Sequence, residues 1–241
     1  MPFKHGKNTT VLLGAVNLSP YLDSADLSLD MDTADTTMFG ATWKSAIGGT
    51  YGAKVDLGGL YDPAEASLSS LLLAGTPGVL TVAPAGALAI GDRARLFSAI
   101  DSSWQQSNPV GGMVAVKASM TCTGTVGFGD VLHILSEDTN TTVGAEKDDT
   151  AATSTGWTAH LHVIAVDAGT WTIKLEDAAV SNTYSDVTGG AFTATAAPTS
   201  QRLQGAAATT QLRRYVRYTA TRSGGGAGDG ITFLLAYARN F

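Results

Sequence analysis

Apolar and polar residues alternate along several stretches of the chain, and this alternation predicts β-strands. In the clearest stretch, residues 25–32, successive side chains point to opposite faces, so the strand has one apolar face and one acidic face. The apolar face carries Leu27, Leu29 and Met31, and the acidic face carries Asp26, Asp30 and Asp32. Further strand-length runs, separated by Gly and Pro, cover residues 11–16, 78–82, 93–104, 112–123, 160–166, 170–176, 191–196, 212–220 and 231–238. The chain is therefore expected to be mainly β.

One segment, residues 62–74, has the pattern of a helix instead. Asp62 can cap its first turn, Pro63 needs no amide hydrogen there, and Glu65 completes a capping box. The apolar side chains that share one face are Ala64, Leu68, Leu71 and Leu72. We expect this face to pack against a sheet as a structural helix.

Composition and turn signals predict two β units. Of the 241 residues, 44% are apolar and 15% are charged, and the 28 Gly suit turns between strands better than helices. The pattern predicts an N-terminal arm at residues 1–8, a first β unit with the flanking helix at residues 9–125, and a second antiparallel β-sandwich at residues 126–241.

Charge and patterning exclude several classes of function. The formal net charge of −6 argues against general nucleic-acid binding, which needs clustered Lys and Arg. The N-terminus lacks an export-signal pattern, and Pro and Gly interrupt the uncharged residues 66–91, so no membrane anchor is predicted. Cys122 lies in an alternating run and is expected to be a buried thiol.

The motifs predict no catalytic, cofactor or metal site. A Gly-x-Ser-x-Gly elbow is absent and the chain has only 4 His, so we expect no enzyme. His160 and His162 share a strand face and would suit a metal if His133 joined them, but a half-exposed strand face is the simpler interpretation. The glycine-rich residues 224–230 lack the Lys and Ser/Thr of a phosphate loop and are interpreted as a hairpin connection.

Three arginines, Arg213, Arg214 and Arg217, form the densest basic cluster. Alternation places Arg213 and Arg217 on one face of a strand and Arg214 on the other. A phosphate or acidic-ligand site is one interpretation. Pairing with carboxylates of the same or a neighbouring subunit is favoured, so the cluster is a candidate for ion pairing between subunits.

Short motifs in the first half point to a family. Residues 33–40 read Thr-Ala-Asp-Thr-Thr-Met-Phe-Gly, and residues 58–62 read Gly-Gly-Leu-Tyr-Asp before the predicted helix. Later elements are Val-Ala-Pro-Ala-Gly at residues 82–86 and Pro-Val-Gly at residues 109–111. Together these motifs, over about residues 8–125, resemble tail tube proteins of long-tailed bacteriophages. The second half resembles β-sandwich modules appended to virion proteins.

This resemblance implies a tail-tube-like β-sandwich or barrel with one flanking helix, hexameric rings of the chain stacked into a tube, and a second domain outside the tube. The implied partners are the chain itself, other virion proteins, and DNA that passes without tight binding. The implied location is the virion tail, assembled in the host cytoplasm. Asp26, Asp30 and Asp32 are then expected to line the channel and repel the DNA backbone, although an ordinary solvated strand would show the same pattern.

Two other functions remain open at this point. One is a capsid decoration or other minor virion structural protein, in which the same β units bind a lattice instead of each other. The other is a carbohydrate-binding β-sandwich, because the second half contains aromatic residues that could stack on sugars. These residues are Trp157, Trp171, Tyr215 and Tyr218.

Overall fold

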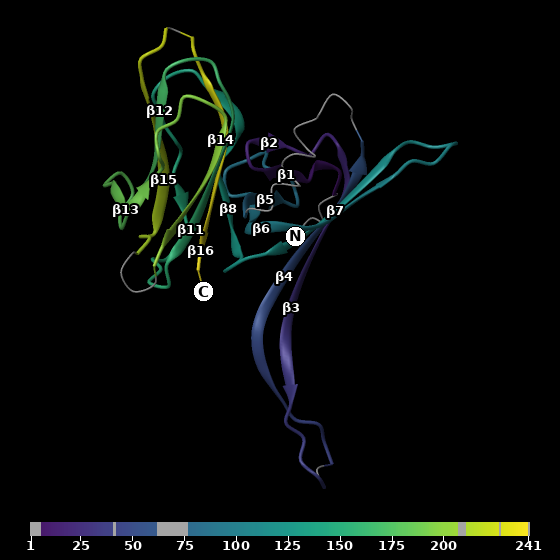
Figure 1. The fold of residues 1–241 in the computed structure, drawn as a ribbon. Helices are drawn as coiled ribbons and strands as arrows, with labels where there is room; N and C mark the ends of the chain where they lie inside the picture. The colour runs from purple at the N-terminus through teal and green to yellow at the C-terminus, as the bar shows by residue number, and fades with distance from the viewer. Residues whose placement is uncertain (1–5, 41, 62–76, 207–210, 227, 241) are drawn as a thin grey trace. The chain divides into compact units, whose positions relative to one another are not determined.

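The computed structural model describes residues 6–40, 42–61, 77–206, 211–226 and 228–240, and its regular structure is almost entirely β (Figure 1). The mainly β class predicted from the alternation is confirmed. A short 3-10 turn, η1 (Gly6–Asn8), precedes the first strand. The helix predicted at residues 62–74 lies outside the described residues. Within the described ranges, no helix is long and apolar enough to cross a membrane.

The strands form two compact units, which we call the sandwich unit and the hairpin unit. The sandwich unit comprises Met1–Pro20, Gly78–Phe97 and Thr125–Phe241, and the hairpin unit comprises Tyr21–Pro77 and Ser98–Gly124. The strands are β1 (Thr10–Leu13), β2 (Val16–Asn17), β3 (Leu22–Asp35), β4 (Ala46–Leu60), β5 (Gly78–Ala83), β6 (Arg93–Ser107), β7 (Ala115–Cys122), β8 (Gly127–Asp138), β9 (Thr142–Val143), β10 (Lys147–Asp148), β11 (Trp157–Val166), β12 (Thr170–Ala178), β13 (Ser185–Ala191), β14 (Thr199–Gly205), β15 (Tyr215–Ser223) and β16 (Ile231–Arg239).

These units do not follow the expected division at residue 125 throughout. Thr125 begins the last segment of the sandwich unit, but β1, β5 and the first part of β6 belong to this unit as well. The reason is apolar packing between distant segments, since Leu12 and Leu96 share a buried cluster with Val131 and Leu234. Turn signals along the chain do not report such contacts. Whether residues 9–125 act as an assembly domain and residues 126–241 as an accessory domain stays a prediction.

The core of the sandwich unit lies between two antiparallel sheets. One sheet contains β14, β11, β16 and β8 in that order, and the other contains β10, β15, β12 and β13, with β9 also paired to β15. Their facing side chains form one buried cluster that includes Trp157, Trp171, Phe233 and Tyr237. Burying each such large apolar side chain contributes roughly 1.5–3 kcal/mol. The predicted second antiparallel β-sandwich is therefore confirmed.

Residues 157–163 of strand β11 are buried on both faces. Trp157, Leu161 and their alternating neighbours face the core between the two sheets. The side chains between them, including His160 and His162, are fully buried on the other face. That face is covered from within the same unit, where β1 pairs with β5 and Thr81 of β5 hydrogen-bonds to both histidines.

The hairpin unit is a four-stranded antiparallel sheet with the order β3, β4, β7 and the distal part of β6. Strands β3 and β4 are 14 and 15 residues long and run side by side as a two-stranded arm beyond their pairing with β7 (Figure 1). The loop at its tip is closed by a hydrogen bond from the Thr36 amide to the Ser45 carbonyl at 2.8 Å. The strand predicted at residues 25–32 lies inside β3.

Candidate functional site

One face of the arm is apolar and open to solvent. The strand register places Leu27 opposite Val55, Leu29 opposite Ala53, and Met31 opposite Tyr51, so their side chains share one face. Val55, near the base of the arm, is buried. Farther along, Leu29 is 51% exposed and Tyr51 is 82% exposed. We call Leu27, Leu29, Met31 and Tyr51 the apolar face of the arm.

The opposite face is polar and carries the predicted acidic residues. Asp26 lies opposite Asp56 and Asp30 lies opposite Gly52, and both aspartates are exposed, as the alternation predicted. A β-bulge between Met31 and Thr33 interrupts the alternation at Asp32, whose side chain accepts a hydrogen bond from Thr50 Oγ1 at 3.2 Å. The bulge gives Asp32 a different setting from the other two. Their role as a channel lining stays a prediction.

The polar face also carries charged residues from β4, namely Lys54 and Asp56. Lys54 Nζ lies 2.9 Å from Asp56 Oδ1, and Ser119 of β7 donates a hydrogen bond to the same oxygen. The Ser119 hydroxyl and then Lys54 hold the pKa of Asp56 below its usual range. These residues come from β4 and β7. Alternation in residues 51–60 could have identified Lys54 and Asp56, but not their pairing with β3.

A shallow hollow of about 320 Å³ lies on this polar face. Its polar lining residues are Ser24, Asp26, Asp56, Ser103, Gln105, Lys117 and Ser119. In the part of the chain that the structure describes, no three His, Cys, Asp or Glu residues are grouped to hold a metal ion. The hollow therefore presents a polar surface without a built metal site.

The tip of the arm is apolar as well. Three large side chains of the loop between β3 and β4 are almost fully exposed, namely Met38, Phe39 and Trp43. Val110 and Met113, in the loop between β6 and β7, are exposed in the same way. Exposed apolar side chains that gather on projecting segments are typical of surfaces that bind another protein.

The three predicted arginines are paired with carboxylates of the same chain. Arg213 Nε donates to Asp177 Oδ1 at 2.8 Å, and Arg217 Nε donates to Glu176 Oε2 at 2.8 Å. Arg214 forms a bidentate pair with Asp148, at 2.7 and 2.6 Å, which lowers the pKa of Asp148 to about 2. The structure shows ion pairing of all three arginines within the subunit. Their pairing with a neighbouring subunit stays a prediction.

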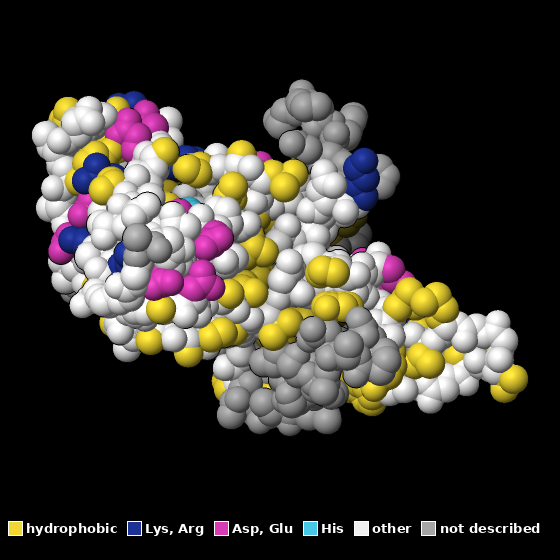
Figure 2. All heavy atoms as spheres, turned by 90° about the horizontal axis from the view of Figure 1, so that it is seen from above, with side chains coloured by type: hydrophobic (Ala, Val, Ile, Leu, Met, Phe, Trp, Pro, Cys, Tyr) yellow, Lys and Arg dark blue, Asp and Glu magenta, His cyan; other side chains and the backbone are white. Residues whose placement is uncertain are grey.

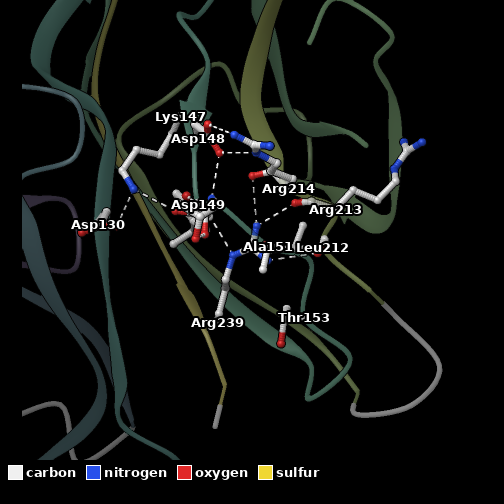
Figure 3. Close-up of polar contacts among 12 residues, drawn as sticks. Asp130, Lys147, Asp148, Asp149, Ala151, Thr153, Leu212, Arg213, Arg214 and Arg239 are labelled. Carbon is white, nitrogen blue, oxygen red and sulfur yellow. Dashed lines mark hydrogen bonds and ion pairs between the residues drawn. The ribbon is translucent and has the colours of Figure 1, made fainter. Parts of the chain in front are cut away.

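A second ionic network beside these arginines was not identified from the sequence. Figure 3 shows Lys147 between Asp130 and Asp149, and its Nζ lies 3.0 and 2.8 Å from their carboxylates. Arg239 donates to Asp149 Oδ2 at 2.8 Å and to the carbonyl oxygens of Ala151, Leu212 and Arg213. The network joins β8, β10 and β16 and satisfies its own charges, so we interpret it as structural.

His133 does not join His160 and His162 in a metal site. His160 and His162 lie opposite Ala236 and Leu234 in β16, whereas His133 lies opposite Leu235 and therefore on the other face of the sheet. His133 stacks on Phe233 at a centroid distance of 3.9 Å. The half-exposed strand face expected for His160 and His162 is wrong, because the layer of β1, β2 and β5 covers this face and both rings are fully buried.

The remaining candidates are buried or partly buried side chains. Trp157, Trp171 and Tyr218 lie in the core, which leaves only Tyr215 of the four aromatic residues partly accessible for stacking on a sugar. Cys122 is half-buried, and burial raises the pKa of its thiol to about 11, so it stays protonated near neutral pH. Figure 2 shows one face of the molecule, on which hydrophobic side chains are spread over the surface together with charged ones.

No protein-family model matches the chain, and no curated protein matches its sequence. Three solved structures are similar to it at low identity. A chain of the virion of a native gene transfer agent particle is 15% identical, with a TM-score of 0.42 over 52% of this chain and 98% of that chain. A subunit of the SPP1 tail tube is 11% identical, with a TM-score of 0.42 over 51% and 77%. The SPP1 Dit protein, described as a hub adsorption protein, is 13% identical, with a TM-score of 0.38 over 97% and 99%.

Proposed function

We propose that the chain is a non-enzymatic structural protein of a phage-like virion tail, and that its copies assemble into stacked rings forming a tube through which DNA passes. The observation that carries this proposal is the arm of β3 and β4, whose apolar face is open to solvent in the single chain. The motifs at residues 33–40 and 58–62 resemble tail tube proteins. Residues 33–40 lie at the tip of the arm, and residues 58–60 lie at the end of β4.

The apolar face needs a partner surface. Leu29, Met31 and Tyr51 lie side by side on a sheet that projects from its unit, and contiguous exposed apolar side chains of this kind mark association surfaces. The outer edge of β3 needs a partner too, since among the described strands β3 pairs with β4 alone. An unpaired edge of 14 residues is a ready template for another strand. A second copy of the chain satisfies both requirements.

The polar face would then line the channel. Acidic residues outnumber basic ones on and beside it, with Asp26, Asp30, Asp32 and Asp56 against Lys54 and Lys117. Repeated around a ring, this excess would repel the phosphate backbone and let a duplex move without sticking. A sixfold ring and the virion tail as its location are what the sequence resemblance implies.

The proposal is tested by changing the two faces of the arm separately in the full chain. Leu29→Glu places a charge on the apolar face. Burying this charge against a second copy without an opposite charge is costly, so the concentration needed for assembly should rise by roughly tenfold or more. Ser28→Glu is the matched control, since it adds the same charge at the neighbouring position on the polar face. The readouts are electron microscopy and light scattering, with circular dichroism to show that both variants fold.

The wild-type chain should form rings or tubes, Leu29→Glu should not, and Ser28→Glu should. Tubes that tolerate Leu29→Glu would contradict the role of the apolar face. A wild-type chain that stays monomeric alone but binds capsids would instead favour the capsid decoration alternative.

A further inference from the structure

Three buried side chains form a continuous hydrogen-bonded relay inside the sandwich unit. Thr81 Oγ1 of β5 lies 3.0 Å from Nδ1 of His160 and 2.8 Å from Nε2 of His162, both on β11. His162 Nδ1 lies 2.7 Å from the carbonyl oxygen of Gly14, in the turn between β1 and β2. Gly14 has a φ of 60°, which favours glycine there, and its amide donates to the Val79 carbonyl of β5 at 2.9 Å.

The Gly14 carbonyl oxygen ends the relay, and the direction of every hydrogen bond follows from it. A carbonyl oxygen only accepts, so His162 Nδ1 carries a proton and neutral His162 has a bare Nε2. The Thr81 hydroxyl must then donate to that Nε2, and its oxygen must accept from Nδ1–H of His160. His160 Nε2 is left without a proton, and within the described residues it has no hydrogen-bond partner. With both rings neutral, the hydrogen bonds therefore fix each ring in a single tautomer.

We propose that this relay is an acid-sensitive lock, which holds the β1–β2 turn and β5 on β11 at neutral pH and releases them when the two histidines are protonated. Protonation of His162 at Nε2 would place two donors, the ring N–H and the Thr81 hydroxyl, against each other. Protonation of His160 at Nε2 would bury a cationic N–H that lacks an acceptor. Protonation of either histidine breaks the hydrogen-bond pattern that holds the β1–β2 turn and β5 on β11.

Among the described residues, the surroundings of the two rings offer no carboxylate and only backbone carbonyl oxygens to a positive charge. Opposite His160 and His162, β16 contributes the apolar Ala236 and Leu234, and β14 contributes Arg202 and Ser200. β5 contributes the neutral Thr81. Burial, then the neighbouring His162 and the cation of Arg202, lower the pKa of His160 well below its usual value, and the Leu80 backbone offsets this only in part. Burial lowers the pKa of His162 to about 4 against a smaller opposing effect of Gly14.

These shifts fix the pH window of the lock. Both groups have folded-state pKa values below that of an exposed histidine, near 6.5, so the open state binds more protons than the closed state between about pH 6.5 and 4. The stabilisation is complete above this window and is lost as the pH falls through it. Each histidine changes the ratio of closed to open forms by up to about tenfold per pH unit. Acid thus releases the β1–β2 turn and β5. The core between the two sheets contains neither histidine ring, so it should not respond to acid in this way.

Hydrogen–deuterium exchange of the full chain at pH 7.5 and 5.0, corrected for the intrinsic exchange rate, tests the lock. The amides of β1 and β5 should lose protection by roughly tenfold or more at pH 5.0, while those of β12 and β15 keep theirs. His160→Asn combined with His162→Gln, which retains neutral donors and acceptors, should remove this response. His133→Asn is the matched control on the opposite face of the sheet, and it should leave the response in place.

The proposal is overturned if β1 and β5 keep their protection at pH 5.0, if all strands lose it together, or if the double variant responds like the wild type. Should the double variant fail to fold, two substitutions at Thr81 decide instead. Thr81→Ser keeps the hydroxyl and should keep the pH response. Thr81→Val lacks it and should weaken the protection of β1 and β5 already at pH 7.5; equal behaviour of these two variants would contradict the relay.

Discussion

Strands β11 and β3 show how differently the two units are stabilised. In the sandwich unit, residues 157–163 of β11 are buried on both faces. Charged side chains of the same unit, such as Arg213 and Arg239, form ion pairs within the chain. In β3 of the hairpin unit, every side chain is at least partly exposed, although the strand is longer and has a regular apolar face. The sandwich unit has the burial and pairing that a single chain needs. Among the described residues, the arm has an amphipathic pattern whose apolar face is exposed, as the proposed assembly requires.

The largest expected effect is a loss of stability when Leu161 of β11 is replaced by Ala. The same substitution at Leu29 of β3 is the comparison. Leu161→Ala should lower the free energy of unfolding by about 2–5 kcal/mol, because Leu161 is 1% exposed and its removal leaves a cavity. Leu29→Ala should change the unfolding of the unassembled chain by less than about 0.5 kcal/mol, as is usual for surface positions. Urea unfolding measures both. Similar losses at the two positions would show that the arm is already packed in the free subunit.

An intermediate effect is expected in the ionic network. Asp149→Asn removes the charge that holds Lys147 and Arg239, and it should cost about 2–3 kcal/mol, since those cations are mostly buried. Asp56→Asn in the hairpin unit is the matched control and should have no measurable effect, because its pair with Lys54 is exposed.

The pH dependence of the destabilisation by Asp149→Asn can be measured as well. Burial raises the pKa of Asp149, but hydrogen bonds from Lys147 and Tyr237 and the charge of Arg239 outweigh it and lower the pKa below 3.8 overall. A carboxylate with a depressed folded-state pKa stabilises the protein above its unfolded value and loses this effect as the pH falls. The difference between the wild type and Asp149→Asn should therefore be constant above about pH 5 and shrink below pH 4. A difference that grows in acid would contradict this assignment.

The smallest effect on stability, and a specific one on function, is expected on the polar face. Replacing Asp26, Asp30 and Asp32 together by Lys should change the free energy of unfolding within about 0.5 kcal/mol, because all three are exposed. Assembled tubes of this variant should retain DNA at low salt and release it at high salt. The triple change to Asn, which removes charge without reversing it, is the control. Unchanged DNA passage in the Lys variant would place these residues outside the channel.

The sequence was sufficient for features that depend on neighbours along the chain. Alternation correctly predicted that Asp26 and Asp30 share a face opposite Leu27 and Leu29, and it predicted the β class. Turn signals located β3, β5, β6, β7, β11, β12, β15 and β16, since Gly and Pro mark many strand ends. They missed β4, β8 and β14, and the strand predicted at residues 191–196 is wrong, because β13 ends at Ala191. Bulges shift a strand by one residue without a clear sequence signal, and the bulge beside Met31 therefore made Asp32 harder to place.

Features that depend on distant segments could not be predicted. His160 and His162 are buried because Thr81 and Gly14, roughly 80 and 150 positions away, cover them, and a strand with polar residues on one face suggests exposure when considered alone. Lys54 lies beside the acidic residues of β3 only through the register of β4. Likewise, the carboxylates that pair with Arg213 and Arg217 belong to β12, some 36 to 41 residues away.

The carboxylates of β3 also bear on the behaviour of the free subunit, before the assembly proposed above. Among the described strands, the outer edge of β3 is unpaired and lies beside exposed Leu29 and Met31, which is a hazard for amorphous aggregation. Charged side chains on such a strand act as gatekeepers against it. Two arms that approach edge to edge in the wrong register bring their rows of Asp together and repel. Freshly synthesised subunits would thus remain dispersed at low ionic strength, and added salt, by screening this repulsion, should shorten the lag before they associate.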